Sequence, residues 1–176
     1  MAEPYHCEPL GEKHLALRAT FACGEEALDR YLREHARRQM DQRIAAVWVL
    51  HDSAANRIAG YYTLSAIAVE RGELPREFTH RIAQYEVYPA TLIGRLAVDQ
   101  DYQRKRVGGR LLLDALARAL AASREVASVA VVTDAKSQEA QRFYKHHGFQ
   151  VLPTEQHERR LFLPMKTIER LLAQPG

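Results

Sequence analysis

The segment from Gly94 to Leu116 places an apolar strand, a basic loop and a leucine-rich helix in direct succession. The strand ends at Asp99 and the helix begins near Gly108, so the turn between them is short. Backbone N–H groups and the positive end of the helix can there face an anion. The cations of Arg104–Arg106 add positive charge at the same point. Gly108 and Gly109 let a bulky ligand approach the main chain closely. This order of elements predicts a cradle for a phosphorylated cofactor.

Two common phosphate-binding motifs are missing from the sequence. It contains neither G-x-x-x-x-G-K-[ST] nor G-x-G-x-x-G. The absence of both motifs disfavours a P-loop nucleotide-binding protein and a dinucleotide-binding fold. The net charge of +3 is a mild basic bias that favours acidic ligands.

Length and composition favour a single domain. A chain of 176 residues with 47% hydrophobic content can bury a core without metal or disulfide staples, so we expect one domain over residues 1–176. The only cysteines, Cys7 and Cys23, lack metal-ligand spacing and are too few for a disulfide framework. We therefore expect no metal and a reducing, cytoplasmic location. No apolar run approaches the roughly 18 residues of a membrane span, so we expect no membrane segment.

Hydrophobic periodicity predicts alternating strands and helices. Strands are expected at residues 15–21, 45–51, 58–69, 91–98, 126–133, 149–152 and 160–164. Helices are expected at residues 25–42 and 165–173. Two more are expected between them: one begins near residue 108, and the other ends near residue 147. The helix that ends near residue 147 is capped by Asp134 or Ser137 and ended by Gly148. Residues 70–89 are expected to form a long loop with one short helix.

The cradle resembles the pyrophosphate loop of the GCN5-related N-acetyltransferases, whose pattern [QR]-x-x-G-x-[GA] follows a V-D strand end. This resemblance implies an α/β fold with a mixed, mostly antiparallel twisted sheet flanked by helices, and acetyl-CoA as the acetyl donor. It implies that acetyl-CoA contacts the strand end and the loop: Leu96, Ala97, Val98, Gln103, Arg104, Lys105, Arg106, Val107, Gly108 and Gly109. One position departs from the pattern, because Arg106 stands where the family has its first glycine.

A second segment, A-Q-R-F-Y-K-H-H-G-F at Ala140–Phe149, resembles the helix A-x-x-F-Y-x-x-x-G-F of the same family. It makes Tyr144 the candidate general acid. In acyl transfer from a thioester an amine attacks the carbonyl and the CoA sulfur leaves as a thiolate that benefits from a proton. A tyrosine with a pKa of about 10 is protonated at neutral pH. The alternative is that Phe143 and Tyr144 only pack the helix onto the sheet.

Three further segments resemble the toxin-type branch of this family: F-A-C-G-E-E-A-L-D-R-Y-L, G-R-L-A-V-D and L-P-M-K-T-I. The resemblance implies acetylation of the α-amino group of aminoacyl-tRNA, a block of translation, inhibition by a ribbon-helix-helix antitoxin and a possible homodimer. No side-chain general base stands out. An α-amino group with a pKa of about 7.7 to 8.0 is already largely neutral, in contrast to lysine near 10.4, so proton removal through water can suffice.

Basic and aromatic side chains offer weaker signals for tRNA or a partner protein. Arg30, Arg33 and Arg37 share a face of the expected helix 25–42 by spacing, and an acidic surface could dock there. Interleaved carboxylates fit a solvated helix face equally well. Tyr85 and Tyr88 in the long loop are candidates for stacking on bases.

The sequence therefore predicts an acetyl-CoA-dependent N-acetyltransferase with aminoacyl-tRNA as the preferred acceptor. One alternative keeps the chemistry with another primary amine: a protein N-terminus, a polyamine or a small molecule. A different alternative is that Arg106 has spoiled the cradle, and that the domain is a non-catalytic module bound to an antitoxin.

Overall fold

The computed structural model describes residues 3–152, 154, 155, 157 and 159–175. The strands are β1 (Tyr5–Pro9), β2 (Ala46–Asp52), β3 (Arg57–Glu70), β4 (Val87–Val98), β5 (Ala130–Asp134), β6 (Gln150–Val151) and β7 (Arg160–Pro164). The helices are α1 (Glu26–Arg30), α2 (Ala36–Asp41), α3 (Arg76–Thr79), α4 (Val107–Ala122), α5 (Gln138–His146) and α6 (Met165–Ala173). A π-helical turn, η3 (Tyr31–His35), joins α1 to α2, and short 3-10 turns connect other elements.

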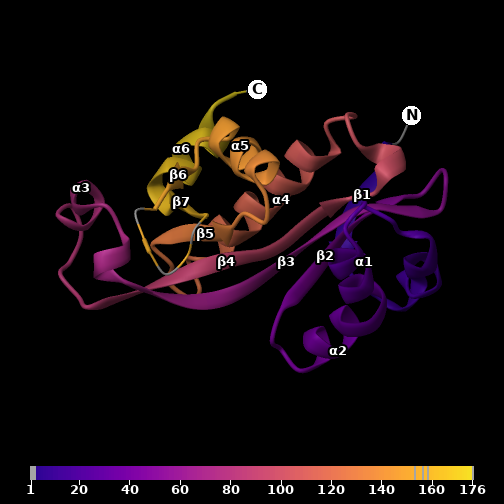
Figure 1. Ribbon diagram of the computed structural model, residues 1–176, viewed down its shortest axis with the longest axis horizontal. Coiled ribbons are helices and arrows are strands. Elements are labelled where there is room, and N and C mark those ends of the chain that lie inside the picture. The colour runs from indigo at the N-terminus through magenta and orange to yellow at the C-terminus, as the bar shows by residue number, and fades with distance from the viewer. Residues whose placement is uncertain (1–2, 153, 156, 158, 176) are drawn as a thin grey trace. The chain divides into compact units, whose positions relative to one another are not determined.

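The strands form a mixed sheet in the order β1-β2-β3-β4-β5-β7-β6 (Figure 1). Strands β4 and β5 pair in parallel, with Ile93 opposite Thr133. The pairs β1–β2, β2–β3, β5–β7 and β6–β7 are antiparallel. The expected α/β architecture, a mixed and mostly antiparallel sheet flanked by helices, is confirmed.

The chain divides into two compact units, each built from two separate stretches. The first unit contains residues 1–65 and 94–115, and the second contains residues 66–93 and 116–176. Both the loop after β4 and the start of α4 belong to the first unit. Helix α5 and strand β5 belong to the second.

The first unit is held by an aromatic and aliphatic core between its helices and strands β2 and β3 (Figure 1). The ring of Tyr61 stacks on Tyr31 at 6.2 Å and meets Phe21 edge-on at 5.5 Å. The apolar stripe predicted for the first helix faces this core: Leu32 and Ala36 are buried, and Leu28 and Met40 pack against them. The period-3.6 spacing therefore identified the buried face correctly.

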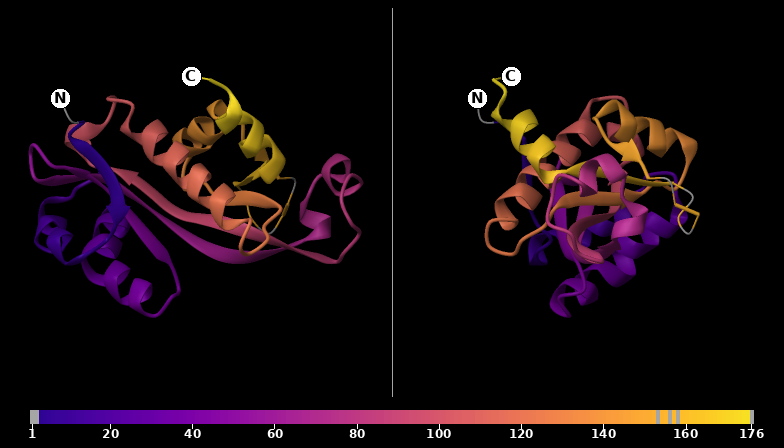
Figure 2. Two further views of the ribbon diagram at one scale, coloured as in Figure 1. Left: turned by 180° about the vertical axis from the view of Figure 1, so that it is seen from behind. Right: turned by 90° about the vertical axis from the view of Figure 1, so that its left-hand side faces the viewer.

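The second unit has its own core, in which helix α6 packs on β5 and β7 (Figure 2). The Phe78 ring of α3 meets Phe162 of β7 edge-on at 5.4 Å. Helix α5 begins as predicted, since the Ser137 hydroxyl accepts the Ala140 N–H at 3.1 Å. It is followed by Gly148 with φ of +95°, the expected left-handed stop.

Three predicted element boundaries are wrong. Residues 15–21 do not form a strand: Ala16–Thr20 is a 3-10 helix, and β1 occupies the edge of β2 instead. Strand β4 begins at Val87, which shortens the expected loop 70–89. Strand β5 begins at Ala130 because the Val126 N–H bonds to the Ala122 carbonyl at 2.9 Å and extends the end of α4.

No helix in the part of the chain that the structure describes is long and apolar enough to cross a membrane.

Gly60 of β3 allows a close approach that α4 and β4 require within the first unit. A Cβ atom at this position would lie 2.5 Å from Leu111 Cδ1 and 2.8 Å from the Ala97 carbonyl oxygen. We expect Gly60→Ala to lower the free energy of unfolding by about 1 to 3 kcal/mol, the usual cost of overpacking. Urea unfolding measures this change. Gly72→Ala is the matched control, since nothing lies within 4 Å of its added Cβ; an equal loss in both variants would contradict the steric explanation.

Candidate active site

The loop that follows β4 is fixed at its start by the buried carboxylate of Asp99. Its Oδ2 accepts the Ala22 N–H at 3.1 Å, and its Oδ1 accepts the Asp101 N–H at 2.9 Å. Arg57 lies 3.1 Å from Asp99 and 2.8 Å from Asp101. A carboxylate that is only 2% exposed requires hydrogen-bond donors of this kind in place of water. Asp99 therefore defines where the strand ends.

Tyr102 and Gln103 fix the middle of the same loop. The buried Tyr102 hydroxyl donates to Asp52 Oδ2 at 2.7 Å. Burial and this hydrogen bond raise the pKa of Tyr102 to about 12. The Gln103 side-chain amide donates to the carbonyls of Cys23 and Val98, each at 2.9 Å. Gln103, which the sequence assigned to cofactor binding, thus ties the loop to the strand end. No sequence signal pointed to Asp52 or Arg57.

Beyond Gln103 the loop exposes its three cations at the beginning of α4. Arg104, Lys105 and Arg106 are all exposed. Arg104 and Arg106 have left-handed backbone, with φ of +63° and +62°. The Arg106 carbonyl accepts the Arg110 N–H at 3.2 Å, so Arg106 directly precedes the helix. The first turn, Val107 to Gly109, presents amide N–H groups that have no acceptor within the helix. This arrangement suits an anionic group.

The strand before the loop carries the other residues expected to bind cofactor. Ala97 is buried, whereas Leu96 and Val98 are partly exposed. The Val98 carbonyl is already occupied by the Gln103 amide. The guanidinium of Arg95 lies 3.5 Å from the centre of the Tyr31 ring. The structure thus brings residues 96–98 and 103–109 together in the first unit.

Tyr144 lies in the second unit, on α5, and its ring is only 6% exposed. Phe143 and Phe149 surround it with ring centres at 5.2 and 5.3 Å. Burial raises the pKa of the Tyr144 hydroxyl to about 12, and a hydrogen bond with the Thr133 side chain acts in the opposite direction. The hydroxyl is therefore a neutral hydrogen-bond donor at physiological pH.

Residues 43–151 match the family model described as an acetyltransferase (GNAT) domain. The match covers more than half of the chain, including the loop, the first turn of α4 and Tyr144. The chain belongs to the GNAT acetyltransferase family.

Relatives extend the likeness along the chain. The protein is 31% identical over 136 residues to the tRNA-acetylating toxin of Mycobacterium tuberculosis, which covers 77% of this chain and 80% of the relative. A structure of AtaT complexed with acetyl-methionyl-tRNAfMet matches with a TM-score of 0.88 and 32% identity, covering 96% of this chain and 99% of AtaT.

A second AtaT structure contains a tyrosine-to-phenylalanine variant bound to the C-terminus of the antitoxin AtaR and acetyl-CoA. It matches this GNAT chain with a TM-score of 0.81 and 30% identity, covering 98% of this chain and 100% of AtaT.

The arginines expected to contact tRNA or a partner are largely paired with carboxylates. Arg33 lies 2.9 Å from Glu26. Arg37 lies 3.2 Å from Glu12 and 3.3 Å from Asp41. These pairings fit a solvated helix face better than a site reserved for phosphate.

The two loop tyrosines differ from each other. Tyr85 is 65% exposed, as stacking on a base requires. Tyr88 is buried, and its hydroxyl donates to the Ala83 carbonyl at 2.8 Å. The expectation that Tyr88 stacks on tRNA is therefore wrong, because its ring belongs to the core of the second unit.

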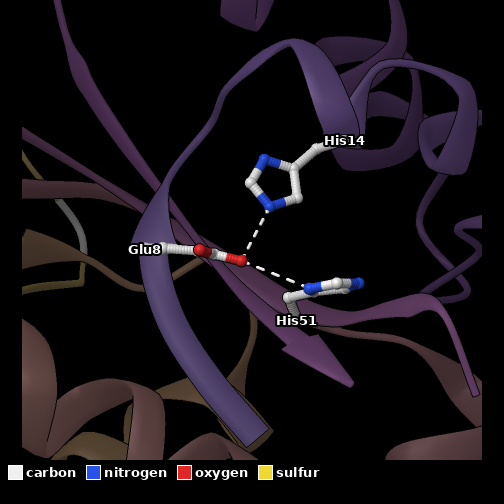
Figure 3. Close-up of side chains that lie close together, drawn as sticks. All are labelled: Glu8, His14 and His51. Atoms are coloured by element: carbon white, nitrogen blue, oxygen red, sulfur yellow. Dashed lines mark hydrogen bonds and ion pairs between the residues drawn. The ribbon is translucent and has the colours of Figure 1, made fainter. Parts of the chain in front are cut away.

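One cluster in the described part of this acetyltransferase has the side chains of a metal site: Glu8, His14 and His51 (Figure 3). Glu8 Oε1 lies 3.0 Å from His14 Nε2 and 3.2 Å from His51 Nδ1. The Gly11 N–H donates to His14 Nδ1 at 2.9 Å. A neutral His14 then carries its proton on Nε2 and donates it to Glu8, so this nitrogen offers no lone pair to a metal. The cluster is a hydrogen-bonded network.

This network makes a prediction about pH. Burial opposes the charged form of Glu8, but hydrogen bonds from Lys13 and His14 outweigh it and lower the pKa of Glu8 to about 2. Because the unfolded value is about 4.3, the charged carboxylate stabilises the fold above that pH, and the contribution is lost as the pH falls toward 2. We expect Glu8→Gln to be less stable than the wild type at pH 6, with a gap that closes below pH 4 in urea unfolding. The exposed Glu125→Gln should show no such gap; a pH-independent gap for Glu8→Gln would contradict this origin.

The left-handed backbone of Arg106 makes a second prediction. A side chain in this conformation costs about 1 kcal/mol or more, a penalty that glycine avoids. We expect Arg106→Gly to raise the free energy of unfolding by up to about 1 kcal/mol in urea titrations. Lys105→Gly is the control. Lys105 does not have a positive φ, so this variant should have a lower free energy of unfolding than the wild type. A loss of stability in both variants would show that the Arg106 side chain matters more than its backbone.

Proposed function

We propose that this protein transfers the acetyl group of acetyl-CoA to the α-amino group of aminoacyl-tRNA and thereby blocks translation. The observation that carries the proposal is its likeness to AtaT in complex with acetyl-methionyl-tRNAfMet, which spans 96% of this chain at a TM-score of 0.88. The M. tuberculosis relative named tRNA-acetylating toxin supports the same acceptor.

Acetyl-CoA fits the first unit by its charge and its main chain. The exposed cations Arg104, Lys105 and Arg106, together with the first amides of α4, supply donors for a pyrophosphate. The strand at Leu96–Val98 supplies main-chain groups for an extended amide chain such as pantetheine. The loop is held in place by Asp99, Tyr102 and Gln103, so these donors are ordered before the cofactor binds. The acetyl-CoA in the AtaT structure supports this assignment.

Arg106 is compatible with this role despite replacing the family glycine. It adopts the positive φ that glycine would take, so the loop keeps its path. Its side chain is exposed and adds a cation. This geometry favours an active cradle over the alternative of a spoiled, non-catalytic domain.

In the proposed reaction the amine attacks the thioester carbonyl, the C–S bond breaks, and the sulfur departs with the bonding electron pair. Tyr144 donates a hydrogen bond, and finally a proton, to that sulfur. The amine loses its own proton to solvent and Tyr144 regains a proton from solvent, so the products are an amide and CoA thiol. The α-amino group of an aminoacyl ester needs no strong base, since about half or more of such amines are neutral near pH 8.

An antitoxin is the proposed protein partner, because an AtaT neighbour is bound to the C-terminus of AtaR. We propose that it is of the ribbon-helix-helix type and that the enzyme forms a homodimer. Aminoacyl-tRNA as substrate also favours a cytoplasmic location.

The test is transfer of labelled acetyl from acetyl-CoA to a mixture of charged tRNAs. We expect label on charged tRNA alone, and a loss of about a hundredfold or more in rate with Tyr144→Phe, the size of effect that a general acid supplies. Isothermal calorimetry with acetyl-CoA accompanies the assay, and Tyr144→Phe should bind the cofactor normally.

Each other outcome has a distinct meaning. Saturable acetyl-CoA binding without label on tRNA would contradict the acceptor and favour another primary amine. Failure of the wild type to bind acetyl-CoA would favour the non-catalytic interaction module. Full activity of Tyr144→Phe would remove Tyr144 from the chemistry while leaving the acceptor intact.

A further inference from the structure

Arg95 of β4 is a partly buried cation of the first unit that rests on an aromatic ring. Its guanidinium carbon lies 3.5 Å from the centre of the Tyr31 ring. At this separation, which is close to van der Waals contact, the planar guanidinium has to lie flat against the ring. Tyr31 is itself held in place, because its hydroxyl donates to Gln39 Oε1 at 2.9 Å and its ring stacks with Tyr61. The support for Arg95 is therefore fixed.

The stack leaves the hydrogen-bond donors of Arg95 without a protein acceptor. A guanidinium carries its N–H donors in its own plane, and stacking on a ring uses none of them. Within the described part of the chain, no oxygen accepts a hydrogen bond from this guanidinium and no carboxylate forms an ion pair with it. The other partly buried arginines of the first unit all have such a partner: Arg18, Arg33, Arg37, Arg57 and Arg110. Donors of a partly buried charge are normally matched, so those of Arg95 suit an acceptor that arrives with a ligand.

Arg95 stands at the end of the cofactor strand that is remote from the phosphate cradle. It directly precedes Leu96–Val98, the segment proposed for the pantetheine chain, and Asp99, where the loop begins, is four positions further along. At about 3.3 Å per residue in an extended strand, this spacing is roughly 13 Å. The acetyl thioester is the end of acetyl-CoA that lies away from the phosphates. Arg95 is thus placed toward the acetyl group and away from the pyrophosphate.

The ring beneath Arg95 comes from an irregular part of the first unit. Strand alternation places Arg95 on the same face of β4 as Ala97, which belongs to the core cluster that contains Tyr31. Tyr31 is the first residue of the π-helical turn η3, which interrupts the helical segment between α1 and α2. Such turns are rare and are frequent at functional sites. The location of this turn beside the cofactor strand supports a role in binding a substrate.

We propose that Arg95, supported by Tyr31, binds a phosphate of the acceptor tRNA and so helps to bring the aminoacyl end to the acetyl group. This inference rests on the proposed function. Because the amino acid is esterified to the tRNA, its carboxyl group carries no charge, and the anions of such an acceptor are its phosphodiesters. A guanidinium held flat on a ring presents parallel N–H donors that match the oxygens of a phosphate. Arg95 therefore favours a nucleic-acid acceptor over a small amine that has no phosphate.

The test measures binding of uncharged tRNA by fluorescence anisotropy between about 50 and 200 mM salt, and acetyl transfer to charged tRNA in the same buffers. Arg95→Met removes the charge and keeps a long side chain. We expect it to raise the Kd for tRNA and the KM for charged tRNA about tenfold, the effect of one charge-assisted contact, with kcat unchanged. The slope of log Kd against log salt should fall by about 0.7, as for the loss of one phosphate contact to a single strand.

Two further variants separate the contact from general charge. Arg95→Lys should keep the wild-type slope, because the charge remains, and should recover only part of the affinity, because lysine lacks the planar fork. Arg38→Met is the matched control, since Arg38 is an exposed arginine of α2 in the same unit and the variant removes the same charge. It should leave the Kd for tRNA unchanged. Isothermal calorimetry should give the wild-type Kd for acetyl-CoA in each variant, which shows that the first unit remains folded.

The proposal is overturned if Arg95→Met binds tRNA with wild-type affinity and salt dependence, or if Arg38→Met is weakened equally, since net charge would then explain the effect. Loss of acetyl-CoA binding in Arg95→Met would also overturn it and assign Arg95 to the structure of the unit. A wild type that binds tRNA but transfers no acetyl to charged tRNA would contradict the proposed function, and the binding comparison would still decide the role of Arg95. A wild type that binds no tRNA would contradict both.

Discussion

The arrangement of the loop that follows β4 depends on the buried carboxylate of Asp99. It joins three parts of the first unit: the segment before α1 through the Ala22 N–H, strand β3 through Arg57, and the turn after β4 through the Asp101 N–H. A buried carboxylate must be matched by hydrogen-bond donors. Moving one of these segments away from Asp99 would therefore cost several kcal/mol. The loop then continues from a fixed origin, and Tyr102 and Gln103 confine it further.

This anchoring explains how the loop tolerates arginine in place of glycine. A glycine reaches positive φ without strain, whereas Arg104 and Arg106 are held there by the structure on either side. The Arg106 carbonyl is engaged by the first turn of α4, and Gln103 fixes the chain before Arg104. The conformational cost is offset by anchors that are already in place, and the exchange adds cations beside the helix N-terminus. Electrostatic attraction for a phosphate can thus replace the steric freedom that glycine gives.

The sequence predicted those parts of the fold that follow from local pattern. The stripe from Leu28 to Met40, the Ser137 cap and the Gly148 stop depend on residues close in the chain, and each is confirmed. The prediction for segment 15–21 is wrong: it forms a 3-10 helix, and the edge of the sheet beside β2 is taken by β1, a long-range pairing that local pattern does not show. The same limit applies to the site. Motifs pointed to the loop, but Asp52 and Arg57 hold it through contacts distant in sequence, which no spacing reveals.

Burial changes the chemistry that a tyrosine can perform here. On its ordinary pKa of about 10, a tyrosine is a slightly weaker acid than a thiol of about 8.5, and proton transfer to a thiolate is a small step. Burial raises the pKa of Tyr144 to about 12, so the phenol is a weaker acid still and complete transfer to the thiolate is more strongly uphill. The useful contribution is then a hydrogen bond that strengthens as charge develops on sulfur, with the proton following late. A donor of this kind depends more on its direction than on its acidity, because it must be aimed at the sulfur before the C–S bond breaks. The packing of the Tyr144 ring against Phe143 and Phe149 fixes the position of the phenol oxygen from which such a bond would be made.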